Sequence, residues 1–162
     1  MILFHGSDKV IEKPIVNLGR NKVDFGQGFY LTNLQDQAAK WAKIIAFKNS
    51  ADKAFVSVFD FDNGTLATLG FRYKKFQAYD MEWLDYVIDC RNGGNQQNQY
   101  DVVEGGVAND NVIDTVENYE NGIITAEQAL GQLQYKKVNH QICIRSQKVI
   151  DELLRFVRWE EV

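Results

Sequence analysis

The sequence has few residues of the types that build disulfide and metal frameworks. It contains one proline, two cysteines and two histidines among 162 residues. Two cysteines are too few for a disulfide framework, and Cys90 and Cys143 lack the spacing of a zinc site. Each lies in an apolar stretch, so we expect buried thiols in a reducing compartment. His5 and His140 lie far apart in the sequence, and no metal site is predicted.

Long apolar runs and an excess of basic charge are also absent. No stretch approaches the roughly 20 apolar residues that span a bilayer. The first residues, MILFHGS, lack the basic start and apolar run of a signal peptide. The net charge is −4, from 18 basic and 22 acidic residues, so non-specific nucleic-acid binding is not expected. These features predict a cytoplasmic protein that does not associate with membranes.

The remaining composition is that of a globular protein, with 45% hydrophobic and 25% charged residues. The length is typical of one domain and we find no internal repeat, so a single domain over residues 1–162 is predicted. The polar segment 91–99, RNGGNQQNQ, is expected to be a mobile loop within it.

Apolar periodicity predicts a mixture of strands and helices. Strands are expected at 1–5, 28–32, 53–62, 100–106, 138–146 and 156–162. Helices are expected at 33–49, 80–90, 111–122, 125–134 and 147–155. Because these elements do not alternate strictly, the predicted fold class is α+β.

Side-chain types near the helix ends predict how some helices begin. Thr32 or Asn33 is expected to cap the helix at 33–49, Thr125 the helix at 125–134, and Ser146 the last helix. Helical spacing in 33–49 predicts one buried stripe, made of Ala38, Trp41, Ala42, Ile45 and Ala46.

Two short motifs carry the functional hypothesis. In LFHGS, His5 ends a strand and is followed by Gly6 and Ser7. In DFGQGFYLT, two glycines precede a strand that carries Tyr30, and a helix follows. Either motif alone is most often structural, because histidine at a strand end and tyrosine in a strand usually serve packing. Their order along the chain is more specific than either motif.

This order resembles the ADP-ribosyltransferase superfamily, in the poly(ADP-ribose) polymerase and diphtheria-toxin branch. There, one strand bears His-Gly-Thr or His-Gly-Ser, a later strand bears Gly-x-Tyr-Leu-Thr, and a third carries a glutamate. The chain is most similar to a bacterial family of unknown function in that clan, often encoded beside a small protein. The similarity covers nearly the whole chain, more loosely at DVVEGGVANDNV and NHQICIRS. It implies an ADP-ribosyltransferase-like split β-sheet core with an NAD-binding cleft, flanked by helices.

The resemblance implies NAD as a substrate and assigns roles to the motif residues. His5 would give a ring N–H to a ribose hydroxyl, and backbone groups of Gly6 would bind the nicotinamide carboxamide. Tyr30 would stack on the flat, electron-poor nicotinamide ring.

Further residues complete the NAD-binding set that the resemblance implies. Ser7 belongs to the first motif, and Gly26 and Gly28 would keep side chains away from the dinucleotide. Arg20 is the candidate for a diphosphate contact, with a solvated loop charge as the alternative.

The sequence departs from the family at the third motif, where Gln141 stands in place of the glutamate. An amide forms hydrogen bonds, but it cannot act as a general base or counter the charge of an oxocarbenium-like transition state. Superfamily members without the glutamate include mono-transferases and inactive forms, so polymer synthesis is disfavoured. The predicted catalytic set is His5, Tyr30 and Gln141, with a purely structural Gln141 as the alternative.

Other polar residues near these motifs have simpler interpretations. Glu104, at a strand end before two glycines, is expected to project into a cleft. Asp110 fits a helix N-cap, and Asp24 is expected to tie its loop by binding backbone N–H groups. In a strand, His140 should point to the face opposite Gln141.

Three functions of different classes follow. The first is a mono-ADP-ribosyltransferase that modifies an unknown protein or nucleic acid, as the toxin of a bacterial toxin–antitoxin pair with a small antitoxin-like partner. The second is an NAD-binding or partner-binding pseudoenzyme, which Gln141 supports. The third is a nucleic-acid-binding domain that uses Trp41, Trp83 and Trp159 for stacking. It ranks last, because the chain is acidic and two of these residues fit helical core stripes.

Overall fold

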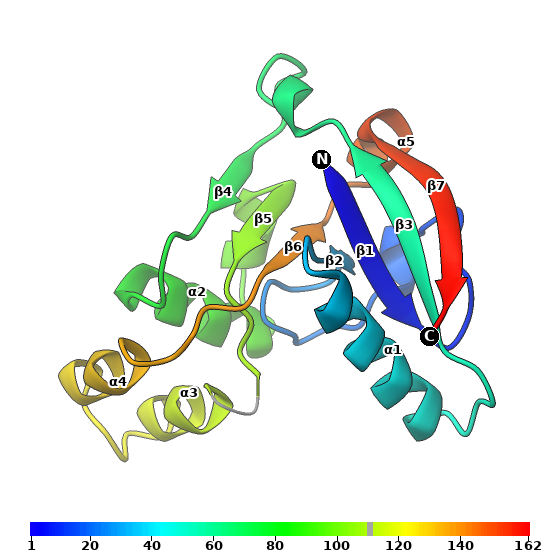
Figure 1. The fold of residues 1–162 in the computed structure, drawn as a ribbon. Coiled ribbons are helices and arrows are strands. Elements are labelled where there is room, and N and C mark those ends of the chain that lie inside the picture. Colours follow the sequence, from blue (N-terminus) through cyan, green and yellow to red (C-terminus); the bar gives the residue numbers. More distant parts are fainter. Residues whose placement is uncertain (110–111) are drawn as a thin grey trace.

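A computed structural model describes residues 1–109 and 112–162 of the chain. Within this part, seven strands form two sheets that lie side by side, with five α-helices around them (Figure 1). Sheet A has the strand order β1 (Ile2–Ser7), β3 (Phe55–Phe61), β7 (Leu154–Glu161). Sheet B has the order β2 (Phe29–Leu31), β6 (Gln141–Ile144), β5 (Val102–Gly105), β4 (Tyr73–Lys75). The predicted α+β class is confirmed.

The helices surround the sheets and fall close to the predicted ranges. They are α1 (Gln35–Lys48), α2 (Met81–Arg91), α3 (Ile113–Glu120), α4 (Ala126–Leu133) and α5 (Gln147–Leu153). Short 3-10 helices are η1 (Val16–Leu18), η2 (Asn63–Thr65) and η3 (Gln96–Gln99). Over the described ranges, no helix combines the length and the apolar character needed to cross a bilayer. The Asp110 cap proposed from the sequence lies outside the described residues.

Within the described residues, one isolated bridge joins the backbones of the two sheets. Neighbouring strands are antiparallel, except for β4 and β5, which are parallel. An isolated bridge joins β1 to the residue after β2: Phe4 N–H donates to Thr32 O over 2.8 Å, and Thr32 N–H donates to Phe4 O over 2.9 Å. Since this bridge is isolated, β1 and β2 separate on either side of it.

Apolar side chains cover both faces of sheet B. One face packs against sheet A and α5, and Leu3 and Ile142 lie in that core. The other face packs against α2, α3 and α4, and Trp83 and Cys143 lie there. Because side chains alternate along a strand, neighbouring residues of β6 face different cores.

Helix α1 covers the outer face of sheet A through three buried alanines, Ala38, Ala42 and Ala46. It lies so close to β1 that a Cβ on Gly6 would stand 2.0 Å from Ala38 O. Contact through such small residues makes the buried face of α1 narrow. Trp41 falls outside it and is 39% exposed, so its predicted place in the buried stripe is wrong.

Only one predicted cap bonds as expected. Thr125 and Gln128 form a capping box at α4, which confirms that prediction. The N-cap position of α1 is Leu34, which forms no side-chain cap bond, and Thr32 Oγ1 accepts from Leu34 N–H over 3.1 Å instead. Ser146 stands at the N-cap position of α5 without a side-chain cap bond.

The segment 91–99 has regular structure, contrary to the expected loop. It contains the last residue of α2 and all of η3. Asp89 Oδ2 accepts from Gln96 N–H over 2.9 Å, which ties the start of η3 back to α2.

Both cysteines are buried and free, as predicted. Burial raises the pKa of Cys90 and of Cys143 to about 12, so neither thiol ionises near neutral pH. Their role is packing.

Candidate active site

His5 lies at the point where the two sheets separate. Its Nδ1 is 2.7 Å from Tyr30 O, so a neutral ring donates from Nδ1 to that carbonyl. Burial lowers the pKa of His5, which keeps the ring neutral. The other nitrogen, Nε2, is then an acceptor. The neutral ring therefore offers an acceptor at Nε2, whereas a ring N–H that donates to a ribose hydroxyl was expected from the sequence.

The same hydrogen bond accounts for the gap between β1 and β2. Phe4 exchanges backbone hydrogen bonds with Thr32, so in a continued ladder Gly6 would pair with Tyr30. His5 occupies Tyr30 O instead, and no such bridge forms. The backbone N–H and C=O of Gly6 therefore face the gap, which we call the β1–β2 split.

Tyr30 presents an aromatic ring rather than an acid–base group. Its hydroxyl donates to Gly26 O over 2.6 Å and accepts from Phe25 N–H over 3.0 Å. Burial raises its pKa well above the usual range. The ring packs against the core on the α2 side of sheet B and is only partly buried.

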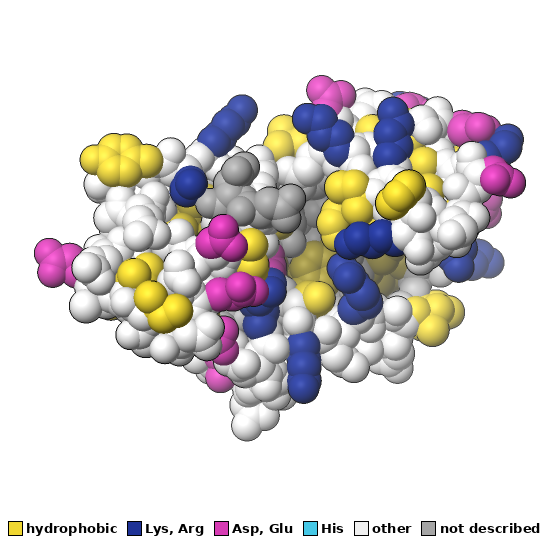
Figure 2. All heavy atoms as spheres, turned by 90° about the horizontal axis from the view of Figure 1, so that it is seen from below, with side chains coloured by type: hydrophobic (Ala, Val, Ile, Leu, Met, Phe, Trp, Pro, Cys, Tyr) yellow, Lys and Arg dark blue, Asp and Glu magenta, His cyan; other side chains and the backbone are white. Residues whose placement is uncertain are grey.

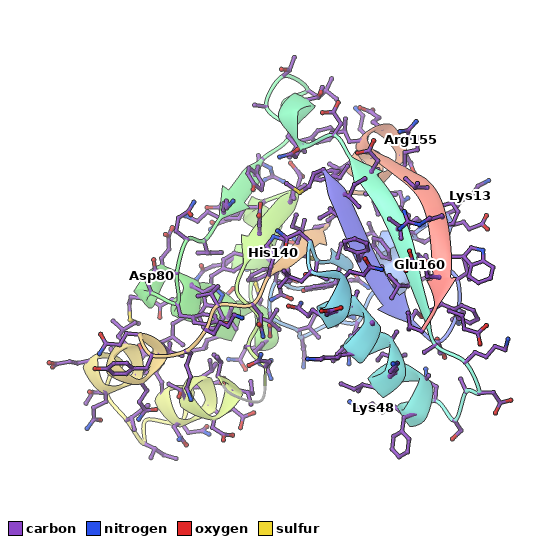
Figure 3. The ribbon with its side chains drawn as sticks, viewed as in Figure 1. Lys13, Lys48, Asp80, His140, Arg155 and Glu160 are labelled. Carbon is purple, nitrogen blue, oxygen red and sulfur yellow. The ribbon has the colours of Figure 1, made fainter. Side chains whose placement is uncertain are left out.

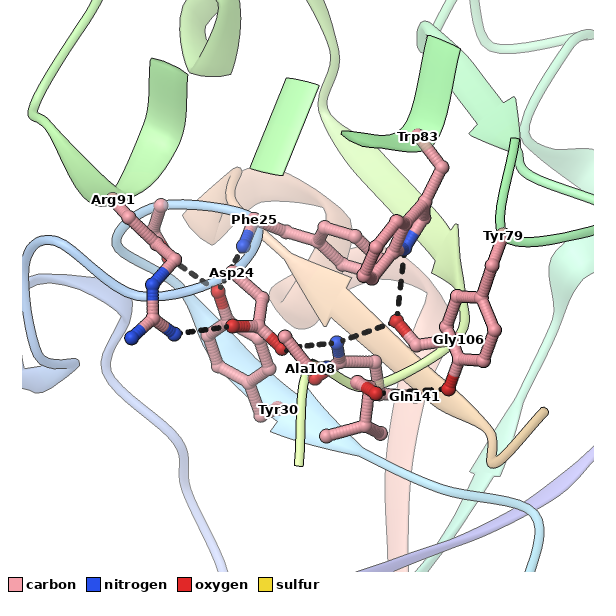
Figure 4. Close-up of polar contacts among 11 residues, drawn as sticks. Asp24, Phe25, Tyr30, Tyr79, Trp83, Arg91, Gly106, Ala108 and Gln141 are labelled. Atoms are coloured by element: carbon pink, nitrogen blue, oxygen red, sulfur yellow. Dashed lines mark hydrogen bonds and ion pairs between the residues drawn. The ribbon is translucent and has the colours of Figure 1, made fainter. Parts of the chain in front are cut away.

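Gln141 is buried at the start of β6, and the NH₂ group of its side-chain amide donates two hydrogen bonds. Its Nε2 donates to Asp24 Oδ2 over 3.0 Å and to Gly106 O over 3.1 Å (Figure 4). Both partners are acceptors, which fixes the orientation of the amide. No hydrogen bond to Gln141 Oε1 forms within the described residues.

Asp24 connects Gln141 to three other parts of the chain. Its Oδ1 accepts from Arg91 Nη1 over 2.9 Å, and its Oδ2 accepts from Ala108 N–H over 2.8 Å (Figure 4). We call Asp24, Arg91, Gln141 and the Ala108 N–H the Asp24 cluster. The sequence indicated that Asp24 binds backbone N–H groups. It gave no sign of the contacts to Arg91 and Gln141.

The three predicted catalytic residues lie on two faces of sheet B. Tyr30 pairs with Cys143, and Gln141 lies two residues from Cys143, so Tyr30 and Gln141 share the α2-facing side. The His5 ring lies on the other side, with its centroid 4.4 Å from that of Phe29. A ligand that touches all three must pass through the β1–β2 split.

The predicted glycine roles are explained by protein packing. A Cβ on Gly28 would lie 2.5 Å from Cys143 Sγ, because the loop passes close over β6. Gly26 has a φ of +79°, and a Cβ there would lie 2.2 Å from Gln97 Oε1. A Cβ at these two positions would meet Cys143 and Gln97, so packing within the protein also requires glycine there.

Two further predicted NAD-binding residues, Ser7 and Arg20, contact other side chains of the protein. Ser7 is buried, and its hydroxyl donates to Asp8 Oδ1 over 3.1 Å. Arg20 is exposed, and its guanidinium carbon lies 5.8 Å from the ring centroid of Trp41 on α1. This contact keeps Arg20 beside α1, at the outer surface.

A second polar cluster lies on the opposite face of sheet B, around Glu104. His140 Nε2 is 2.9 Å and Lys75 Nζ is 3.4 Å from Glu104 Oε1, and the Tyr73 hydroxyl donates to Oε2. Burial would raise the pKa of Glu104, but the hydrogen bonds from His140 and Tyr73 and the charge of Lys75 lower it to about 2. We call these four residues the Glu104 cluster. Glu104 is thus fully paired instead of projecting into a cleft.

His140 lies at the start of β6 beside the beginning of α1 (Figure 3). Its Nδ1 accepts from Asn33 N–H over 3.0 Å, and its Nε2–H donates to Glu104. Each ring nitrogen therefore has one partner in the neutral form. As expected, His140 and Gln141 bind different groups on opposite faces.

The surface near these clusters is hollowed. A cavity of about 490 Å³ lies at the beginning of α1, lined among others by Gln37, Lys40 and Asn139. Seen from below, several Lys and Arg side chains surround a recess between the two halves of the molecule (Figure 2). Within residues 1–109 and 112–162, no three His, Cys, Asp or Glu side chains are grouped to hold a metal ion.

Comparison with known proteins places the chain in one family. No curated protein and no solved structure matches it. A family model described as "Protein of unknown function (DUF3990)" matches residues 1–156. The chain therefore belongs to the DUF3990 family.

Proposed function

We propose that this chain is an NAD-dependent mono-ADP-ribosyltransferase. The observation that carries the proposal is the β1–β2 split, which lies between His5 and Gly6 on β1 and Tyr30 on β2. It offers the unprotonated Nε2 of His5 and the backbone edge of Gly6, and the Tyr30 ring lies on the face of sheet B opposite the His5 ring. An acceptor for a sugar hydroxyl, a donor–acceptor pair for a carboxamide and a flat aromatic surface are complementary to nicotinamide riboside.

In the proposed reaction, the bond between ribose C1′ and the nicotinamide nitrogen breaks. Its electron pair leaves with nicotinamide, which neutralises the pyridinium charge. A nucleophilic atom of the target then bonds to C1′ and releases its proton to water. Gly6 and Tyr30 would hold the leaving group, and His5 would orient the ribose, so the protein contributes mainly by positioning.

Gln141 would act through its amide oxygen. Its Nε2 is held by Asp24 and Gly106, and the side chain lies on the face of sheet B that carries Tyr30. A carbonyl there accepts a hydrogen bond from a ribose hydroxyl but cannot remove the proton of an acceptor. This favours a single transfer to a reactive target group over polymer synthesis. By resemblance, the target is a macromolecule and the regulator a small antitoxin-like protein.

The test is to measure nicotinamide release and label transfer from labelled NAD⁺ with wild-type protein in cell lysate. Tyr30→Ala should weaken NAD⁺ binding by at least about tenfold, because the aromatic surface is removed. Phe47→Ala is the matched control, since Phe47 is 87% exposed on α1 and lies outside the site. Absence of both nicotinamide release and label transfer, from protein shown to be folded, would contradict the proposal.

One observation favours a second candidate, an NAD-binding pseudoenzyme. The hydrogen bonds of the Gln141 amide to Asp24 and Gly106 are also what a purely structural residue would form. Calorimetric NAD⁺ binding without nicotinamide release, unchanged in Gln141→Ala, would support this candidate over the transferase.

A further inference from the structure

Gln141 stands where the resembling family has a glutamate, and in this chain it has a buried acidic neighbour. Asp24 is 7% exposed, and its Oδ2 lies 3.0 Å from Gln141 Nε2. Gln141 and Asp24 are 117 positions apart in the sequence, so this contact is created only by the fold. We propose that Asp24 is a positioning residue that supplies the negative charge missing at Gln141, acting through the Gln141 amide.

The hydrogen-bond pattern gives the physical basis. A carboxylate that accepts from an amide N–H draws electron density toward the amide oxygen, which makes that oxygen a stronger acceptor. Gln141 Nε2 donates to Asp24 and to Gly106 O, so Gln141 Oε1 is the atom through which the amide would meet a ligand. The charge is thus relayed from the loop to the strand without a proton transfer.

Arg91 orients this charge. It binds Asp24 Oδ1 over 2.9 Å, whereas Oδ2 faces Gln141 and the Ala108 N–H. Arg91 is 29% exposed and the Asp24 side chain 9% exposed. Water therefore screens the arginine more than the carboxylate, and the negative end of the pair points at Gln141.

The same geometry predicts that restoring the family's glutamate would harm the site. A carboxylate at position 141 would meet Asp24 Oδ2 and Gly106 O, which are both acceptors. It would have to remain protonated, because two carboxylates in one buried site cannot both ionise. Without Asp24 as its partner, Gln141→Glu would be expected to improve activity, so this variant separates the two interpretations.

The inference rests on the proposed transferase function. Its test is nicotinamide release from NAD⁺ by wild type, Asp24→Asn, Gln141→Glu and Arg91→Gln. We expect Asp24→Asn to lower kcat about tenfold with little change in KM, because the charge acts on the bound substrate through the Gln141 amide. Gln141→Glu should be slower than wild type, because a protonated carboxylic acid has one donor where the Gln141 amide has two, for Asp24 and Gly106 O. Arg91→Gln, which removes the ion pair but keeps the carboxylate, should lower kcat by less than Asp24→Asn does, by about threefold.

Each outcome of these rate measurements supports or overturns the proposed role of Asp24. A wild-type rate in Asp24→Asn, or a faster Gln141→Glu, overturns it while the transferase proposal stands. Equal losses in Asp24→Asn and Arg91→Gln assign the cluster a structural role only. If Asp24→Asn fails to fold, the rates of Gln141→Glu and Arg91→Gln still distinguish these cases. If wild type releases no nicotinamide, the proposed function fails and the inference falls with it.

Discussion

Asp24 and Glu104 are the two acidic side chains buried in the described part of the chain, and they lie on opposite faces of sheet B. Asp24 comes from a loop and binds groups from α2, β6 and the segment after β5. Glu104 comes from β5 and binds its own neighbours, on β4 and before β6. Asp24 connects segments that are distant in the sequence, whereas Glu104 binds polar side chains at the edge of sheet B. Two equally buried carboxylates therefore have different roles.

The largest effect is expected from removing the carboxylate that joins segments. Asp24→Ala would leave Arg91, Gln141 Nε2 and the Ala108 N–H without their acceptor. We expect a loss of about 4 kcal/mol in the free energy of unfolding, because breaking a buried pair strands its partners. Urea unfolding at neutral pH measures it. A loss below about 1 kcal/mol would show that the contacts of Asp24 do not hold these three segments together.

The next effect is the pH dependence carried by Glu104. Its pKa falls from the ordinary 4.5 to about 2 in the folded protein. A lowered pKa stabilises the folded state above the unfolded value, and this contribution is lost as the pH falls from about 5 to about 2. The shift corresponds to about 3 kcal/mol. In Glu104→Gln, urea unfolding across this range should lose that part of the slope, and an unchanged slope would contradict the assignment.

A smaller effect separates the hydrogen bonds of the Glu104 cluster. Tyr73→Phe removes the hydroxyl that donates to Glu104 but keeps the ring. We expect a loss of about 1 kcal/mol and an acid transition at higher pH, because one group that lowers the Glu104 pKa is gone. An acid transition at the wild-type pH would mean that His140 and Lys75 suffice.

The smallest effect is expected outside both clusters. Trp41 is 39% exposed on α1, and its ring contacts are with the exposed cations Arg20 and Lys48. Trp41→Ala should change the free energy of unfolding by no more than about 0.5 kcal/mol. A loss above about 2 kcal/mol would indicate that this tryptophan is a core residue after all, as its helical spacing first suggested.

Much of the fold could be predicted because it depends on local patterns. Helical and alternating periodicities gave the main elements and the α+β class. The strand β4 was not predicted, because three residues are too few to show a period, and it is held by pairing with β5. The exposure of Trp41 depends on how closely α1 approaches Gly6, which spacing within the helix does not encode.

Less of the candidate site could be predicted from the sequence. The motifs around His5 and Tyr30 marked two strands, but only the structure shows that His5 Nδ1 binds the Tyr30 carbonyl, which leaves Nε2 as an acceptor in the neutral ring. The Asp24–Gln141 contact joins residues 117 positions apart, and no local pattern encodes it. The only signal at Asp24 was an acid two residues before a glycine, which predicts a turn whose backbone N–H groups the acid binds.

The most direct test of the account is a crystal structure of the protein soaked with NAD⁺. The account predicts nicotinamide in the β1–β2 split, with its carboxamide on the backbone of Gly6, its ring on Tyr30 and a ribose hydroxyl on His5 Nε2. NAD⁺ bound only elsewhere, such as in the cavity at the beginning of α1, or an empty split at saturating NAD⁺, would contradict it.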